Sequence, residues 1–262
     1  MTSCRRLAPL FLGLLAACAG GGVGWPEAPA VGDPEPSGPG YLREYKESHY
    51  RELGTDFDRT LTEEAFVKEV QSARVLFLGD VHDDVELHRD HLRLLDALLA
   101  FGWTPALGLE AVGSEDDALL RQHTLGDLPM VTLRSAIRAR WPESWLEDGS
   151  VDAAFYRALL ERARRHRLPV FGLEPTPRLP LEERDARIAA AVRRAAAAHP
   201  GRPIVVVVGH THLLGQGALI RRIGLPSIAV GARLSPALER RAASLAPGYA
   251  RTSGGVWYRK RL

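Results

Sequence analysis

Short apolar runs alternate with longer amphipathic stretches along the chain beyond residue 73. The apolar runs predict β-strands over residues 74–78, 105–109, 169–173, 204–208, 227–230 and 256–259. The run over 204–208 has no polar position, which is expected for a strand that is covered on both faces.

Between these runs, apolar positions recur with helical spacing. They predict helices over residues 61–70, with Thr62 as N-cap, and over 84–101, 151–166, 181–199 and 236–245. This alternation predicts an α/β fold, a single domain with a central, mostly parallel sheet flanked by helices. Residues 113–148 are the least regular and are expected to form helical cover or a lid.

The N-terminal segment has the features of an export signal. Arg5 and Arg6 precede an apolar run over residues 7–17, which makes about 16 Å of helix against a hydrocarbon core of about 30 Å. The run ends in L-A-A-C at Cys18, which resembles the bacterial lipoprotein signal; an ordinary cleaved signal or a chance cysteine are the alternatives.

The expected organisation is therefore a signal peptide (1–17), a lipidated cysteine with a Gly/Pro-rich tether (18–40) and an α/β domain (41–262). The domain would be exported and anchored to a lipid bilayer through Cys18, at the outer membrane or the periplasmic side.

Composition limits the available chemistry. The chain has 262 residues, of which 45% are hydrophobic and 25% charged, with a formal net charge of +2. These values are typical of a globular protein, and the scattered arginines give no basic patch for nucleic acid. The only cysteines are Cys4 and Cys18 in the leader, so a thiolate metal site or a cysteine nucleophile in the domain is excluded.

Two pairs of similar motifs end on polar residues at the ends of predicted strands. G-D-V-H ends at His82 and G-H-T-H at His212, whereas P-x-x-G-L-E occurs twice and ends at Glu110 and at Glu174. In an open parallel sheet the carboxyl ends of the strands lie along one edge, where ligands bind. We therefore expect these four side chains to converge.

Two imidazoles and two carboxylates form a ligand set for divalent zinc, manganese or iron, or an acid–base set for hydrolysis. Asp80 and His210 are expected to support them, because a carboxylate beside an imidazole fixes its tautomer and raises its basicity. Each residue taken alone has a structural alternative, such as capping a loop, whereas their combination at strand ends favours a functional site.

The predicted helix after the first motif adds two histidines. Val85, His88 and Leu92 fall on one helical face that continues to residue 99, and His91 lies one turn from His88. We expect the two histidines either to support the site or to form a polar first turn near solvent.

In their order and spacing, these motifs resemble the ChaN-like haem-binding uptake family, part of a superfamily with TraB, Tiki and erythromycin-esterase proteins. The resemblance covers most of residues 50–231. It includes V-L-F-L-G-D-V-H-D, the strand ending at Glu110, a turn at Pro177-Arg178, a helix start at Arg184-Asp185, and G-H-T-H before I-G-L-P.

The chain departs from the family pattern at two places. Members usually have glutamate at the position of Asp80 and asparagine near Glu174, so the shared core is His82, Glu110 and His212. The resemblance implies haem or iron handling at the envelope; among relatives, Tiki proteins are metal-dependent peptidases and the esterases use a histidine as base. It identifies no haem ligand, because no tyrosine stands in a matching motif.

Three hypotheses follow. The first is an envelope lipoprotein that binds haem or iron without turnover. The second is a metal-dependent hydrolase, either a Tiki-like peptidase or esterase, or a metallophosphoesterase of the calcineurin-like type, which the motifs at His82 and His212 also resemble. That last family needs intervening G-D and G-N-H-[DE] motifs that this sequence lacks. The third is a tethered interaction module. Ligand, substrate and oligomeric state stay open.

Overall fold

The structure is a computed structural model that describes residues 47–142, 144–147, 149, 151–174, 179–215 and 217–261. The predicted signal peptide, Cys18 and the tether lie outside the described residues, as does the expected turn at Pro177-Arg178. Those expectations stay predictions.

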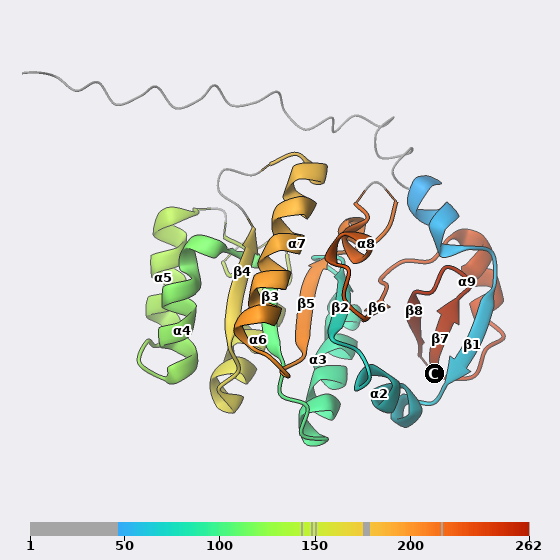
Figure 1. Cartoon of the computed structure of the whole chain (residues 1–262), viewed down its shortest axis with the longest axis horizontal. Helices are drawn as coiled ribbons and strands as arrows, with labels where there is room; N and C mark the ends of the chain where they lie inside the picture. The colour runs from blue at the N-terminus through green and yellow to red at the C-terminus, as the bar shows by residue number, and fades with distance from the viewer. Residues whose placement is uncertain are drawn as a thin grey trace, which may run out of the picture. The chain divides into compact units, whose positions relative to one another are not determined.

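Within the described residues, an eight-stranded sheet has the order β1-β7-β8-β6-β2-β5-β3-β4 (Figure 1). Its six strands from β8 to β4 are parallel, and β7 is antiparallel to both of its neighbours. The strands are β1 (Phe57–Leu61), β2 (Val75–Asp80), β3 (Ala106–Gly113), β4 (Val170–Glu174), β5 (Ile204–Gly209), β6 (Ser227–Val230), β7 (Gly248–Thr252) and β8 (Trp257–Lys260). The predicted α/β fold with a mostly parallel sheet is confirmed.

Helices cover both faces of this sheet. Residues 47–53 are helical, and the other helices are α2 (Glu63–Val70), α3 (Val85–Ala100), α4 (Asp117–Leu125), α5 (Met130–Arg140), α6 (Ala153–His166), α7 (Leu181–Ala198), α8 (Leu219–Ile223) and α9 (Pro236–Ala242). Short 3-10 turns, η1 (Ser114–Asp116) and η2 (His210–His212), follow β3 and β5. In Figure 1, α7 and α8 lie in front of the sheet and α3 behind it.

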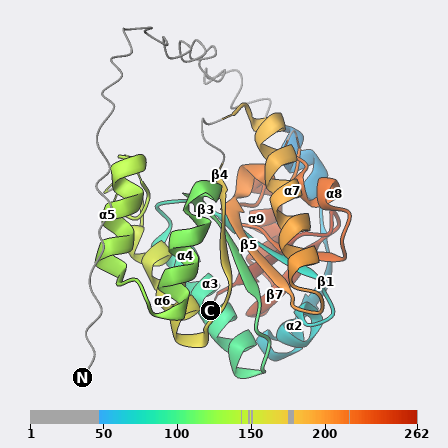
Figure 2. The same cartoon turned by 60° about the vertical axis from the view of Figure 1, so that its left-hand side comes forward.

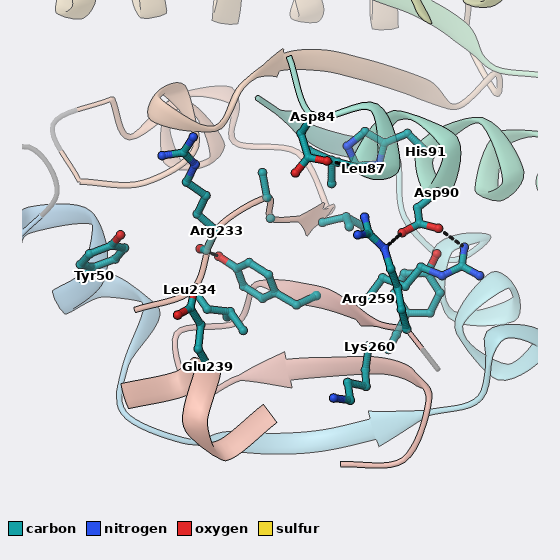
Figure 3. Close-up of a pocket in the computed structure, with 16 residues that line it drawn as sticks. Tyr50, Asp84, Leu87, Asp90, His91, Arg233, Leu234, Glu239, Arg259 and Lys260 are labelled. Carbon is teal, nitrogen blue, oxygen red and sulfur yellow. Dashed lines mark hydrogen bonds and ion pairs between the residues drawn. The ribbon is translucent and has the colours of Figure 1, made fainter. Parts of the chain in front are cut away.

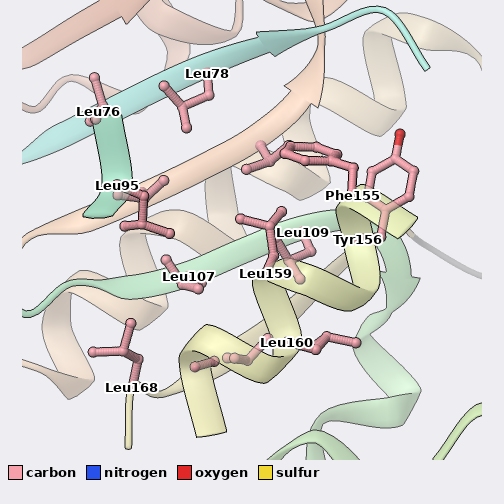
Figure 4. Close-up of a cluster of buried hydrophobic side chains, with 14 of the residues drawn as sticks. Leu76, Leu78, Leu95, Leu107, Leu109, Phe155, Tyr156, Leu159, Leu160 and Leu168 are labelled. Carbon is pink, nitrogen blue, oxygen red and sulfur yellow. The ribbon is translucent and has the colours of Figure 1, made fainter. Parts of the chain in front are cut away.

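The hydrophobic core has one layer on each face of the sheet. Leu76 and Leu78 of β2 and Leu107 of β3 pack with Leu159 of α6 on one face (Figure 4). The alternate residues of β2, such as Phe77, pack under α7 and α8 on the other face. In β5, every residue from Ile204 to Val208 is buried. The central strands are therefore apolar throughout because both of their faces are covered.

All six predicted strands form, whereas β1 and β7 were not predicted. β1 has the sequence FDRTL with three exposed central residues, and β7 is GYART. β1 is a polar edge strand, and β7 lies between β1 and β8 but is short and contains arginine and threonine, so neither carries a continuous apolar signal.

The helix predictions are confirmed with small shifts at the ends. Thr62 caps α2, since its side-chain oxygen accepts the backbone N–H of Ala65 at 3.2 Å. The irregular region 113–148 provides helical cover, because it forms α4 and α5 and α4 packs against α6.

The expected buried face of α3 is confirmed except at its first residue. His88 is buried and the apolar positions of that face up to residue 99 are buried or pack against the core, whereas Val85 is 46% exposed. Leu87, His91 and Leu94 are buried as well, so the buried face is wider than the apolar pattern indicated. Within the described residues, no helix combines the length and the apolar character needed to cross a bilayer.

Candidate functional site at the carboxyl edge of the sheet

The carboxyl ends of β2, β5, β3 and β4 lie side by side because these strands are parallel neighbours. Asp80 ends β2 and is in register with Gly209, the last residue of β5. Glu110 lies in β3, Glu174 ends β4, and His212 ends η2 just after β5. The structure therefore places polar groups from four strands along one edge, and their contacts divide them into two clusters.

One group of side chains, called here the Asp80 cluster, surrounds the end of β2. It consists of Asp80, His82, His88, Asp152 and Tyr156. Oδ1 of Asp80 lies 2.6 Å from Nε2 of His88, and Oδ2 lies 2.9 Å from Nδ1 of His82. The hydroxyl of Tyr156 donates to Oδ2 at 2.5 Å. Nδ1 of His88 lies 2.9 Å from Asp152, the N-cap of α6. One carboxylate thus joins β2, α3 and α6.

The charges in this cluster stabilise one another. Burial alone would raise the pKa of Asp80, but hydrogen bonds from His82, His88 and Tyr156 hold it well below its usual range. Burial alone would lower the pKa of His88, but Asp80 and Asp152 raise it. Burial and the charge of Asp80 also raise the pKa of Tyr156, so the phenol keeps its proton. The cluster is therefore a hydrogen-bonded chain with an ionised centre at Asp80.

His82 is the member of the cluster with the most accessible nitrogen. Its side chain is 36% exposed, whereas those of Asp80 and His88 are 1% exposed. Its ring centroid lies 4.1 Å from that of Trp145. Its hydrogen bonds to described residues are made by Nδ1, so Nε2 has no partner among them. A carboxylate on one nitrogen orients the ring and leaves the other to bind a ligand.

His91 has a different environment from His88. It is buried, and its Nε2 donates to the backbone carbonyl of Gly79 at 2.9 Å. Burial lowers the pKa of His91, so the ring is neutral. His88 therefore contacts the site directly, whereas His91 connects α3 to β2.

The second group, called here the His212 cluster, lies at the ends of β3, β4 and β5. It consists of His212, Glu110, Asp185, Arg184 and Glu174. Nδ1 of His212 bonds to Oδ1 of Asp185, and Nε2 lies 3.1 Å from Oε1 of Glu110. The other oxygen of Glu110 accepts the backbone N–H of Gly209 at 2.6 Å. Arg184 lies 3.2 Å from Nε2 of His212 and 3.9 Å from Glu174.

This cluster is buried and holds a protonated imidazole. Burial alone would lower the pKa of His212, but Glu110 and Asp185 raise it to about 9. Burial alone would raise the pKa of Glu110, but His212 and Arg184 lower it to about 2. Both nitrogens of His212 are engaged and its side chain is 1% exposed. It is therefore neither a free base nor an accessible ligand at neutral pH.

His210 adds a neutral ring at this edge. Its ring meets that of His49 edge-on, with centroids 5.5 Å apart. Burial and the charges of His49 and Arg233 lower the pKa of His210 to about 4, and His82 adds to this effect. His210 thus lies within electrostatic reach of His82, as its place in the motif suggested.

The expected convergence of His82, Glu110, Glu174 and His212 on one point needs correction. Glu110, Glu174 and His212 meet around Arg184, whereas His82 belongs to the Asp80 cluster. Among the described residues, no group of three or more His, Cys, Asp or Glu side chains is arranged to hold a metal ion. A single four-residue coordination sphere is therefore wrong for this structure, and the metal-dependent alternatives gain no support from it.

Sequence reasoning missed three contributors. Tyr156 lies on an amphipathic helix, where its ring gives an ordinary core signal. Asp152 had only the weak signal of an acidic residue in the first turn of the helix predicted over 151–166, whereas the structure makes it the N-cap of α6. Asp185 had only the signal of the Arg184-Asp185 helix start. Their roles depend on α6 and α7 packing beside the strand ends.

A cavity of about 670 Å³ lies between the start of α3, the loop after β6 and the end of β8 (Figure 3). Asp84, His91 and Arg233 line it, and Asp90 on its wall pairs with Arg259 at 3.4 Å. Its volume is within the range of small-molecule sites, about 300–1,000 Å³. The cavity reaches the start of α3, whereas no member of the Asp80 cluster is among the residues that line it.

Fold and site together define an α/β protein with buried His–carboxylate clusters at the carboxyl edge of a parallel sheet. Residues 66–180 match the family model described as haem-binding uptake, Tiki superfamily, ChaN. The match contains Asp80, His82, Glu110 and Glu174, and it confirms the family resemblance predicted from the sequence. A search of the curated proteins finds no match to this chain.

Solved structures share the fold. The structure titled "Cofacial heme binding to ChaN of Campylobacter jejuni" has a TM-score of 0.50 and 13% identity, and the alignment covers 78% of this chain and 94% of that one. The type III effector HopBA1 has a TM-score of 0.49 and 14% identity, with 78% and 96% covered. At such identities the likeness concerns the fold alone.

Proposed function

We propose that this chain is an envelope lipoprotein that binds haem or iron at the carboxyl edge of its sheet, and that the imidazole of His82 reaches the ligand. The observation that carries this proposal is the pairing of a buried, ionised Asp80 with an exposed His82 whose Nε2 has no partner among the described residues. The family match over residues 66–180 supports haem as the ligand.

The residues at this edge fit such a ligand. Haem iron takes an imidazole nitrogen as an axial ligand, and a carboxylate on the opposite nitrogen increases its electron donation. The ring of Trp145 beside His82 offers an apolar surface of the kind that a porphyrin face contacts. Haem would be bound as cargo, so the chain's task is to bind and orient it.

The His212 cluster has a supporting role in this proposal. Its charges are internally paired and buried, so it holds the ends of β3 and β5 in register through the Gly209 N–H that Glu110 accepts. We infer that His212 acts on the ligand only through this framework.

Titration of the full chain with hemin tests the proposal. Wild type and His166→Gln, an exposed histidine at the end of α6, should give the same saturable Soret shift at micromolar hemin. His82→Gln should weaken that binding at least about tenfold, as expected for the loss of an axial ligand. No spectral change with wild type, or an unchanged titration with His82→Gln, would contradict the haem assignment.

A second arm separates haem from iron. The same proteins are loaded with ferric citrate, and bound iron is measured after desalting. Iron retained by wild type but not by His82→Gln, without any hemin response, would restrict the ligand to iron.

The envelope part of the proposal rests on residues 1–40. Labelled palmitate should be incorporated into the wild-type chain in cells and should be absent from Cys18→Ser. Labelling that survives this substitution would contradict the lipid anchor at Cys18 and would leave the proposal of a ligand site unaffected.

A further inference from the structure

A second hollow lies away from the carboxyl edge, along the free side of β4. β4 is the last strand of the sheet and pairs with β3. α4 and α7 both pack against β4, and Figure 2 shows them on either side of it. Between them is a groove of about 430 Å³, within the range of small-ligand sites.

The floor of this groove is apolar and mostly aliphatic. The side chains that form it are Pro169, Val170, Phe171, Ala191, Ala195 and Ala198. Leu125 lines the same groove and is 57% exposed. A concave surface of this kind removes an apolar chain from water, which favours binding by roughly 25 cal/mol of free energy for each Å² of apolar surface that is buried.

Three arginines line the groove. Arg121 comes from α4, Arg194 from α7, and Arg167 follows α6. All three are exposed, and within the described residues their side chains form no hydrogen bond or ion pair. By contrast, Arg140 and Arg162 nearby pair with aspartates. Three unpaired guanidinium groups around an apolar floor give the groove an affinity for anions, because guanidinium binds carboxylates through two parallel hydrogen bonds.

Asp117 is the carboxylate that lines this groove. Its Oδ1 accepts the backbone N–H of Gly172 at 2.8 Å. That N–H belongs to the edge strand, and an added β-strand would need it. Burial raises the pKa of Asp117, and the charge of Arg194, which lines the same groove, opposes this rise. The groove is thus closed to strand addition and more cationic than anionic.

We propose that this groove binds a single-chain amphiphilic carboxylate, the chemistry of a free fatty acid. The acyl chain would lie on the floor formed by residues 169–171 and the alanines of α7, and the carboxylate would pair with the arginines. This site is separate from the Asp80 cluster and does not depend on haem binding.

Calorimetric titration of the full chain with dodecanoate, kept below its micelle-forming concentration, tests this proposal. Saturable 1:1 binding is expected. Dodecanol has the same chain without the charge and should bind at least about tenfold more weakly, as for the loss of a charge-assisted hydrogen bond. Arg121→Gln and Arg194→Gln should each weaken dodecanoate binding by about tenfold.

Matched controls exclude general effects. Arg187 is exposed on the same helix but is not among the residues that line the groove, so Arg187→Gln should bind dodecanoate like wild type. Ala195→Trp fills the floor without changing charge and should abolish binding, with circular dichroism confirming that the variant is folded. Each of these variants should keep the wild-type hemin titration.

Three outcomes would overturn the proposal. One is the absence of saturable binding at millimolar dodecanoate, and another is equal binding by the double variant Arg121→Gln/Arg194→Gln. The third is displacement of dodecanoate by one equivalent of hemin in a His82→Gln background, which would assign the groove to a porphyrin dicarboxylate.

Discussion

Nε2 of His88 lies 2.6 Å from Oδ1 of Asp80, and both side chains are only 1% exposed. The other nitrogen of His88 lies 2.9 Å from Asp152, and its ring stacks on Phe155 with centroids 3.9 Å apart. The imidazole of His88 thus connects a buried carboxylate at the end of β2 to the start of α6. The same carboxylate orients His82, so the accessible imidazole depends on a pair that is hidden from solvent.

Replacing His88 by alanine should destabilise the fold by about 3–5 kcal/mol, because it removes one of the two imidazoles that pair with the buried carboxylate of Asp80. Urea denaturation followed by circular dichroism measures this loss. His166→Ala removes an exposed imidazole and should change the free energy of unfolding by less than about 0.5 kcal/mol. A loss below about 1 kcal/mol for His88→Ala would show that Asp80 is not ionised in the native state.

Tyr156→Phe should lower the free energy of unfolding by about 1.5–3 kcal/mol, which is the range for a hydrogen bond to a charged group. The phenyl ring remains, so its packing beside Phe155 and Trp145 is kept and the loss reports the hydroxyl. Tyr50→Phe, at a half-buried ring, is the control and should be close to neutral. Equal unfolding midpoints for both variants would contradict the role of the Tyr156 hydroxyl.

The free energy of unfolding should fall as the pH rises from about 6.5 to about 9. The pKa of His212 is raised to about 9 in the folded state, from an ordinary value of 6.5. The contribution of His212 to the free energy of unfolding is therefore complete below pH 6.5. It is lost as the pH rises through about 9 and the folded state releases this proton. The loss should be on the order of 1–3 kcal/mol, since one pKa unit corresponds to about 1.4 kcal/mol.

Denaturation at pH 6.5, 7.5, 8.5 and 9 measures this slope. His212→Gln should flatten the profile over that interval while lowering stability at pH 6.5. A wild-type profile that is flat or rises between pH 6.5 and 9 would be inconsistent with a protonated His212.

Gly172→Ala should lower the free energy of unfolding by at least about 3 kcal/mol, which is the upper end of the range for overpacking a core. A Cβ there would lie 2.0 Å from the backbone oxygen of Gly113, and backbone cannot yield as a side chain does. At Gly108 the added Cβ would meet the ring of Phe171 at 2.7 Å, so Gly108→Ala should cost less, about 1 kcal/mol. Gly149→Ala meets nothing within 4 Å and is the control. A larger loss of stability for Gly108→Ala than for Gly172→Ala would contradict the close backbone contact at Gly172.

Local sequence was sufficient for most of the architecture. The six apolar runs and five amphipathic stretches became strands and helices because each signal lies within a short segment, as with Thr62 at the start of α2. β1 and β7 escaped prediction because a short strand with polar residues is defined by the strands that it pairs with.

The sequence by itself determined the α/β class, the family resemblance and the row of polar residues at strand ends, since all three follow from periodicity and motif order. Only the tertiary structure decided which of these residues meet. His82 joined Asp80 and Tyr156, and His212 joined Glu110 and Asp185, because the packing of α3, α6 and α7 against the sheet selects each partner over long separations in the chain. Motif spacing specifies the strand end that holds a side chain, whereas burial and charge pairing specify its partner.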